Sequence, residues 1–196
     1  GFLASPGLSN KIDSLTQSKE VTKIRKDMEK VEKRENKLWH IYYDAISELH
    51  RTQLKIGSDS TLALENWWKT EIDFLKKLKQ NKNYQTSLIG ERLLNMVSAN
   101  FVETRPHYIQ KNDFPAAIVI TQLWIYAQPE SVYAHWTQAN NYALAGDKDL
   151  AFQYLELAYD LGMSRIQSLT KVEAFNNLRD DPRYFSLIEK MEKDDR

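Results

Sequence analysis

The scarcity of glycine constrains this chain more than any other feature. Only six glycines occur in 196 residues, and Gly57, Gly146 and Gly162 fall where helical periodicity stops. The stretches between them are rich in Leu, Lys, Glu, Gln and Ala, which favour helix over strand. The sequence therefore predicts an all-α fold of long helices joined by short connections.

Composition excludes several classes of function. Lys and Arg together number 27, as do Asp and Glu, so the net charge is zero and no long-range field attracts phosphates. There are no cysteines, which excludes disulfides, zinc–thiolate sites and cysteine nucleophiles. The apolar runs are far shorter than the roughly 20 residues that cross a bilayer. We expect no nucleic-acid partner and no membrane span.

The N-terminal part predicts a tail over residues 1–11 and a long-helix hairpin over residues 12–87. Within it, apolar residues recur at alternating three- and four-residue steps, interrupted only by Glu35. This heptad seam comprises Val21, Ile24, Met28, Val31, Leu38, Tyr42, Ala45 and Leu49. Such a seam packs against another helix of the same chain or against a second copy, so a homodimer is one expectation.

A turn at residues 57–60 predicts an N-cap and the start of a second helix. Its expected inward residues are Leu64, Trp67, Trp68, Ile72, Leu75 and Leu78. Residues 80–83 form a polar break after it. The basic cluster just before this break, Lys76, Lys77, Lys79 and Lys82, is typical of a solvated helix end, with an acidic partner or anionic lipid as the alternative.

From residue 88 to 196 we expect helical hairpins. Residues 132–163 can be aligned with the 34-residue tetratricopeptide pattern: Ala139, Ala151 and Ala158 occupy the small contact positions, and Gly146 forms the turn. The bulky positions hold Tyr142 and Leu155. This segment resembles the tetratricopeptide repeat family.

A weaker copy precedes it, with Asp113 as an expected N-cap and Pro115 in the first helical turn. The copy departs from the pattern at Arg105 and Pro106, and an interior proline costs about 3 kcal/mol. We therefore expect its first helix to kink or break near Thr104. Trp124 replaces the usual alanine and predicts wider local spacing.

Residues 173–185 resemble the segment that closes many bacterial repeat proteins, in which a short capping helix covers the last apolar face. The resemblance implies a short stacked superhelix that binds a protein or peptide on its concave face. Carried onto the clearer repeat, the groove positions are Tyr133, Trp136 and Asn140. The alternative for Trp136 is that it packs into the preceding hairpin.

Catalytic and metal sites find little support. His40, Asp44 and Glu48 share a helical face, but such sets are common by chance and no second cluster completes a site. Asp180 and Asp181 precede Pro182 and are typical of a capping turn. The sequence contains no Gly-x-Ser-x-Gly elbow, no phosphate-binding glycine loop and no His-Glu-x-x-His motif. We expect neither an enzyme nor a bound cofactor or metal.

Three functions remain open on the sequence. The leading one is a noncatalytic scaffold for a protein or peptide; the others are a helical accessory part of a larger enzyme, such as a hydrolase, and a small-molecule binder. The last would have a pocket between the N-terminal hairpin and the repeats. The first residues fit a removed signal peptide or a preceding domain equally well, so a cytoplasmic and an exported location both stay open.

The heptad seam makes a measurable prediction. If residues 21–31 pair between chains, sedimentation equilibrium gives a dimer, whereas internal packing of the seam gives a monomer.

Overall fold

Helices make up all the regular structure in the part of the chain that the computed structural model describes. The described residues are 23, 26, 27, 29–38, 40, 59–164 and 169–194, and the N-terminal helical segment covers residues 29–38. It is followed by α3 (Asp59–Lys79), α4 (Tyr84–Gln110), α5 (Phe114–Ala127), α6 (Val132–Ala145), α7 (Lys148–Asp160), the 3-10 helix η1 (Glu173–Leu178) and α9 (Pro182–Asp194). The all-α prediction is confirmed for these residues.

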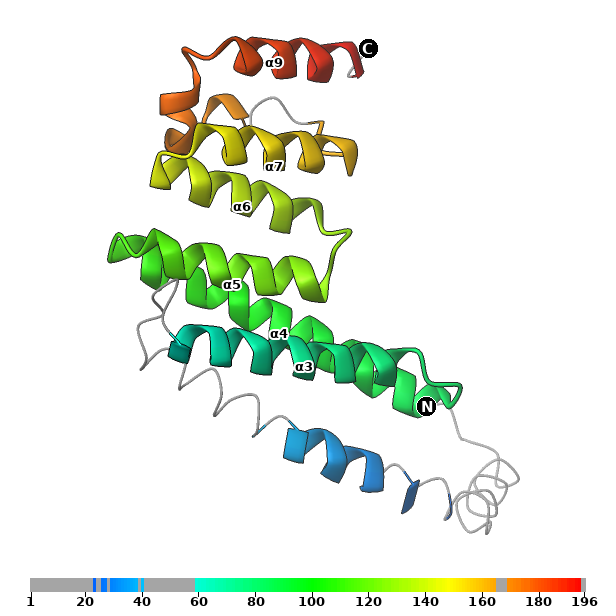
Figure 1. Cartoon of the computed structure of the whole chain (residues 1–196). Helices are drawn as coiled ribbons and strands as arrows, with labels where there is room; N and C mark the ends of the chain where they lie inside the picture. The colour runs from blue at the N-terminus through cyan, green and yellow to red at the C-terminus, as the bar shows by residue number, and fades with distance from the viewer. Residues whose placement is uncertain are drawn as a thin grey trace, which may run out of the picture.

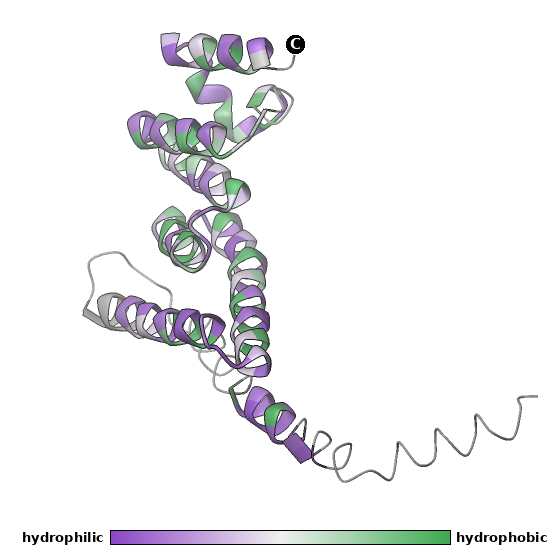
Figure 2. Cartoon of the chain, turned by 90° about the vertical axis from the view of Figure 1, so that its right-hand side faces the viewer, coloured by the Kyte–Doolittle hydropathy of each residue, from purple (hydrophilic) through white to green (hydrophobic). Residues whose placement is uncertain are grey.

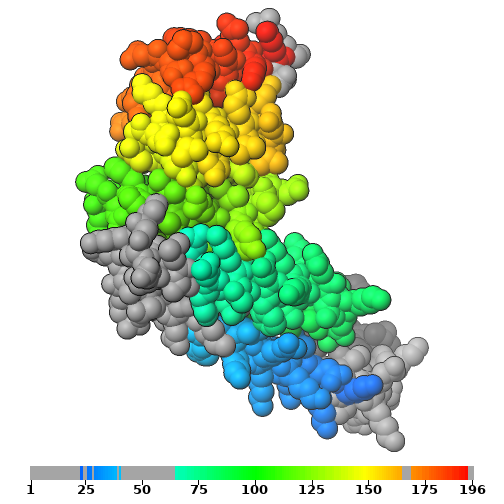
Figure 3. Space-filling model, in the orientation of Figure 1, coloured from blue at the N-terminus to red at the C-terminus, as the bar shows by residue number. Residues whose placement is uncertain are grey.

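The helices are stacked in chain order. Figure 1 shows successive helices lying side by side from α3 at one end to α9 at the other, and Figure 3 shows the same order as bands of colour along an elongated molecule. The main contacts join α3 to α4, α4 to α5, α5 to α6 and α6 to α7, with α9 lying on α7. Figure 2 shows hydrophobic and hydrophilic residues on the same helices, as expected when each helix buries only part of its surface.

The first hydrophobic core lies between α3, α4 and α5. Trp68 is fully buried and meets the rings of Trp67 and Phe101 edge-on, each at a centroid distance of 5.0 Å. Ile72, Leu75 and Leu78 are buried with it, which confirms the inward face predicted for α3, whereas the side chain of Leu64 lies outside the described residues. These large side chains supply most of the apolar area in this half.

A polar contact ties α3 to α5 beside this core. Tyr126 donates its hydroxyl to Asp73 Oδ1 at 2.8 Å, and Lys76 Nζ lies 4.2 Å from the centre of the Tyr126 ring. Lys76 also donates to the backbone carbonyl of Tyr126 at 2.5 Å. One lysine of the basic cluster is thus engaged within the chain, while Lys77 and Lys79 stand in the last turn of α3, where cations favour the helix dipole.

The second core lies between α6, α7, η1 and α9. Ala139, Ala151 and Ala158 are fully buried, so the backbones of α6 and α7 can approach closely, as predicted. Phe175 and Leu178 of η1 are fully buried against the same cluster. Tyr184, Leu187 and Met191 place the apolar face of α9 over it.

The predicted turns are confirmed where the structure describes them. Asp113 caps α5 by accepting from the backbone N–H of Ala116, and Pro115 lies in the first turn of that helix. Asp147 caps α7 in the same way through Leu150 N–H. Gly146 ends α6 with a φ of 85°, a left-handed conformation that other residues adopt only with strain. The short connections before α5 and between α6 and α7 therefore follow from the capping and turn residues within them.

Of the kink or break expected in α4 near Thr104, the break does not occur. It runs unbroken from Tyr84 to Gln110, with Pro106 inside it. Proline removes one backbone hydrogen bond here, but Phe101, Thr104 and Tyr108 are buried on both sides of it. This burial holds the last turns of the helix in place and outweighs the local cost.

The N-terminal segment packs within the chain. Val31 and Leu38 lie against the first core, and the Glu35 carboxylate that interrupts the seam is 3.9 Å from Arg92 of α4. Val21, Ile24 and Met28 are outside the described residues, so pairing between chains stays a prediction. The expected division between residues 87 and 88 falls inside α4, a helix that packs on both α3 and α5.

Gly90 is placed where α4 meets the end of α3. A Cβ on Gly90 would lie 2.3 Å from the backbone nitrogen of Lys79 and 2.7 Å from the carbonyl carbon of Leu78. Backbone atoms cannot move aside as a flexible side chain can, so only glycine permits this approach. Ser87, one turn earlier, donates its hydroxyl to the Lys79 carbonyl at 2.5 Å and marks the same contact.

We therefore predict that Gly90→Ala destabilises the protein by about 1–3 kcal/mol, because α3 and α4 must separate. In an open helix the same change would be stabilising by up to about 1 kcal/mol, so the sign is diagnostic. The measurement is urea unfolding followed by circular dichroism. Glu103→Ala, at an exposed position of the same helix, is the control, and a stability gain in Gly90→Ala would disprove the close contact.

Candidate functional site

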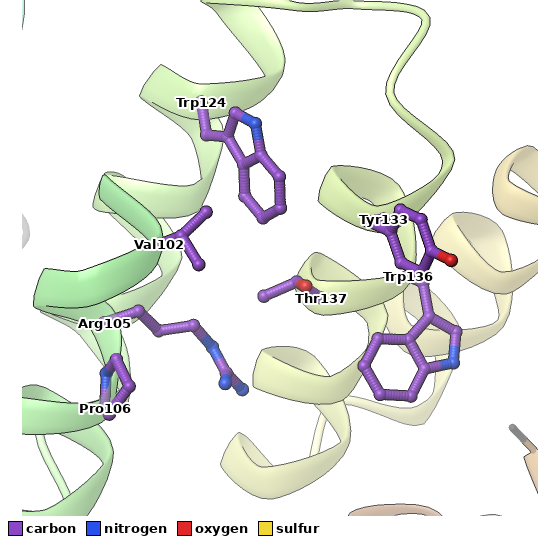
Figure 4. A pocket seen from close by; sticks show the side chains of 7 residues that line it. All are labelled: Val102, Arg105, Pro106, Trp124, Tyr133, Trp136 and Thr137. Carbon is purple, nitrogen blue, oxygen red and sulfur yellow. The ribbon is translucent and has the colours of Figure 1, made fainter. Parts of the chain in front are cut away.

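A pocket of about 470 Å³ opens between α4, α5 and α6. Five of its seven lining residues are apolar or aromatic, and Arg105 is the one charged residue among them (Figure 4). We call it the α4–α6 pocket. Its lining residues are Val102, Arg105, Pro106, Trp124, Tyr133, Trp136 and Thr137.

The aromatic side chains of this pocket come from two helices. Trp124 of α5 donates its Nε1–H to Gln128 Oε1 at 3.1 Å, which satisfies its polar edge and leaves the ring to line the cavity. Tyr133, in the first turn of α6, is 68% exposed, and Val102 across the pocket on α4 is 42% exposed. An exposed tyrosine next to an exposed valine at the mouth of a pocket is typical of a binding surface.

Two of the three residues predicted from the sequence line this pocket. Tyr133 stands at its rim, and Trp136 lines it while also packing against the second core. The Trp136 ring meets Phe175 of η1 edge-on at 5.8 Å, so its packing partner follows it in the chain and is not the preceding hairpin. Its half-buried position gives Trp136 a structural as well as a possible binding role.

The third predicted residue, Asn140, lies beneath the surface. It is 8% exposed, and its Oδ1 accepts a hydrogen bond from the Arg105 guanidinium. The amide oxygen is therefore already engaged by a residue of α4. Its contribution to the pocket is to fix the position of Arg105.

Val102, Arg105, Trp124 and Thr137 were not among the sequence candidates. Trp124 carried a signal, because a tryptophan in place of a small residue predicted wider spacing, and the pocket lies at that point. Arg105 also departed from the repeat pattern, but the sequence did not show which residues it would face. Only the packing of α4 against α6 brings it beside the aromatic residues.

Arg105 is held by neutral partners. Its Nε donates to Asn141 Oδ1 at 2.6 Å and its Nη2 to Asn140 Oδ1, and no carboxylate in the described part of the chain pairs with it. Burial lowers the pKa of the guanidinium to about 10, because removal from water disfavours the charged form. At neutral pH it therefore stays a cation in a largely apolar setting.

A buried polar layer supports the pocket from below, between α5 and α6. Asn141 is fully buried, and its Nδ2 donates to the Ala117 carbonyl at 3.1 Å, to Thr121 Oγ1 at 2.8 Å and to Gln138 Oε1 at 3.1 Å. Gln138, also fully buried, donates to the Ile118 carbonyl at 3.2 Å. These bonds fix α6 against α5 and so fix the rim residues on α6.

His135 is occupied in a different contact. It is 8% exposed, its Nε2 lies 2.8 Å from the Pro129 carbonyl, and its ring stacks on Tyr154 of α7 at a centroid distance of 6.0 Å. Tyr154 in turn stacks on Tyr142 at 5.5 Å. This ladder of rings packs α6 on α7 and does not open into the α4–α6 pocket.

The chain matches no family model, no curated protein and no solved structure. Its function must therefore be argued from its own residues.

The described residues gather no metal ligands: nowhere among them do three His, Asp or Glu side chains converge. Asp44 and Glu48 of the set considered with His40 lie outside these residues. Asp181 accepts from the backbone N–H of Arg183 at 3.0 Å and from its guanidinium, which lowers the pKa of Asp181 to about 2. This is the capping turn that the sequence predicted.

None of the helices in the described part of the chain is long and apolar enough to span a membrane.

Asn141 yields a prediction about the polar layer. Replacing it with Ala removes its hydrogen bonds to the Ala117 carbonyl, Thr121, Gln138 and Arg105 Nε at a fully buried position, so we expect a loss of about 2–3 kcal/mol in the free energy of unfolding. Urea denaturation measures this loss. The matched control is Asn100→Ala. The native Asn100 amide donates only to the Met96 carbonyl of its own helix, so the loss of unfolding free energy should stay below about 1 kcal/mol. Equal losses of unfolding free energy in the two variants would show that the buried layer stabilises the protein no more than a single bond within one helix.

Proposed function

We propose that this protein is a noncatalytic helical scaffold that binds a protein or peptide segment in the α4–α6 pocket. The observation that carries the proposal is the mouth of the pocket, where Tyr133 and Val102 present exposed apolar surface beside an apolar cavity. Tyrosine and tryptophan are enriched in interfaces because they bring large contact areas at low entropic cost. Both types are present here on two rigid helices.

The second part of the proposal concerns architecture: α4 to α7 form two tetratricopeptide-like hairpins. Its support is the row of buried alanines between α6 and α7, the turn at Gly146 and the apolar face of α9 over the last hairpin. Arg105, Pro106 and Trp124 depart from the family pattern, and all three line the pocket. In this proposal the departures open a binding site between the two hairpins.

A small-molecule binder is the competing function, and one observation favours it. A pocket of about 610 Å³ lies between the helical segment 29–38 and α4, lined in part by Val31, Tyr84 and Leu88. Its volume suits a small ligand, and its place agrees with the pocket expected between the N-terminal hairpin and the repeats. Its charged residues Glu35 and Arg92 already face each other at 3.9 Å, however. We therefore place the function in the α4–α6 pocket.

The test is selection from a display library of random twelve-residue peptides on the immobilised protein. We predict enrichment by the native chain and at least a tenfold loss of affinity for the selected peptides in Tyr133→Ala, because the exposed ring contributes contact area and little to folding. Circular dichroism and melting should stay unchanged.

The matched control is Tyr84→Ala. Tyr84 is 77% exposed but stands at the start of α4, beside the competing pocket. If Tyr84→Ala abolishes binding and Tyr133→Ala does not, the site belongs to the other pocket and the proposal fails. Absence of any enrichment would also overturn it.

A further inference from the structure

Arg105 gives the α4–α6 pocket a chemical preference. It is the one charged side chain among the seven lining residues, and the close-up shows it reaching from α4 toward α6 below Thr137 (Figure 4). An arginine at the surface would be surrounded by water and counter-ions. Here it lies beside Val102 and Trp124, where an anion is the most effective partner.

The guanidinium has unused donors. Of its five N–H groups, two are accounted for by Asn141 and Asn140, and no other acceptor for it occurs among the residues that the structure describes. Amide oxygens are neutral, so they orient the cation without cancelling its charge. The side chain is thus held in one position with donors to spare, an arrangement suited to a planar carboxylate.

This inference rests on the proposed function and deepens it. We propose that the partner segment carries an aspartate or glutamate next to an aromatic or aliphatic residue. The acidic side chain pairs with Arg105 at the base of the pocket, while its neighbour packs between Trp124 and the rim.

Two features argue for a peptide segment over other anions. The apolar lining extends from Arg105 to the exposed rim at Tyr133 and Val102, so the pocket accepts an occupant larger than one small carboxylate. A nucleic acid would require a field of positive charge, yet the chain has no net charge and the pocket holds a single cation. The Thr137 hydroxyl at the same pocket offers a further hydrogen-bonding group for the peptide backbone.

The rival explanation is that Arg105 only joins α4 to α6. It does so through the two asparagines, and a purely structural arginine would satisfy the same distances. The two explanations differ in what the pocket selects. A structural tie gives no preference for acidic peptides, whereas a binding group does.

The deciding measurement is made on the native protein and needs no variant. From the peptide library, we expect sequences with Asp or Glu adjacent to Phe, Leu, Ile or Trp to be enriched. The best binder is then synthesised with a fluorescent label, together with its Glu→Gln or Asp→Asn counterpart. We expect the neutral peptide to bind about tenfold more weakly by fluorescence anisotropy, and the difference to shrink as salt rises.

The outcomes separate this inference from the proposed function. Enriched peptides that are apolar but lack an acid, or equal affinity of the acidic and neutral peptides, would overturn the role of Arg105 and leave the scaffold standing. No enrichment at all would overturn both. Arg105→Gln provides a second check in a chain that keeps two donors for the asparagines: it should lose the preference for the acid while still binding the neutral peptide.

If Arg105→Gln fails to fold, the comparison of the two peptides on the native chain still decides the matter. Lys111→Gln, at the C-cap of α4 and outside the pocket lining, is the matched control for loss of one positive charge. It should keep the full preference for the acidic peptide. If Lys111→Gln loses the preference for the acidic peptide as fully as Arg105→Gln, then the net charge of the protein explains the preference and the inference is wrong.

Discussion

The fold depends on how one buried amide joins two hydrophobic cores. Asn141 lies between them and donates to groups of α5, while its oxygen holds Arg105 of α4. Of the helices that the structure describes, those before α6 pack into the first core and those after it pack into the second. Burying a polar side chain is costly unless all its partners are present, so this layer permits only one register between the two halves. The layer therefore also fixes the positions of the helices that line the α4–α6 pocket.

The local parts of this structure could be predicted from the sequence, because they depend on residues a few positions apart. Asp113 and Asp147 cap helices, Gly146 ends one, and Ala139, Ala151 and Ala158 allow close helix packing. The candidate site could be predicted only in part. Tyr133 and Trp136 follow from the helical spacing, but the position of Arg105 depends on contacts between residues 35 and 36 apart in the chain. No local pattern records such a contact.

The expectation that failed is informative about α4. A proline weakens a helix in isolation, and the sequence argument counted that cost alone. Within the protein, the buried Phe101 and Tyr108 flank the weakened turn, and their packing energy belongs to the tertiary structure. Tertiary packing therefore let the sequence keep a residue that lines the candidate site.

Stacking in chain order has a consequence for how the protein folds. Each helix meets chiefly the helices that precede and follow it, so most native contacts require only short loops to close. Chains of this kind fold rapidly, and they can begin at more than one place. The α6–α7 hairpin has two capped helices and a glycine turn, so we expect it to form early. From it, order would spread outward in both directions, and the two halves would meet last at Asn141.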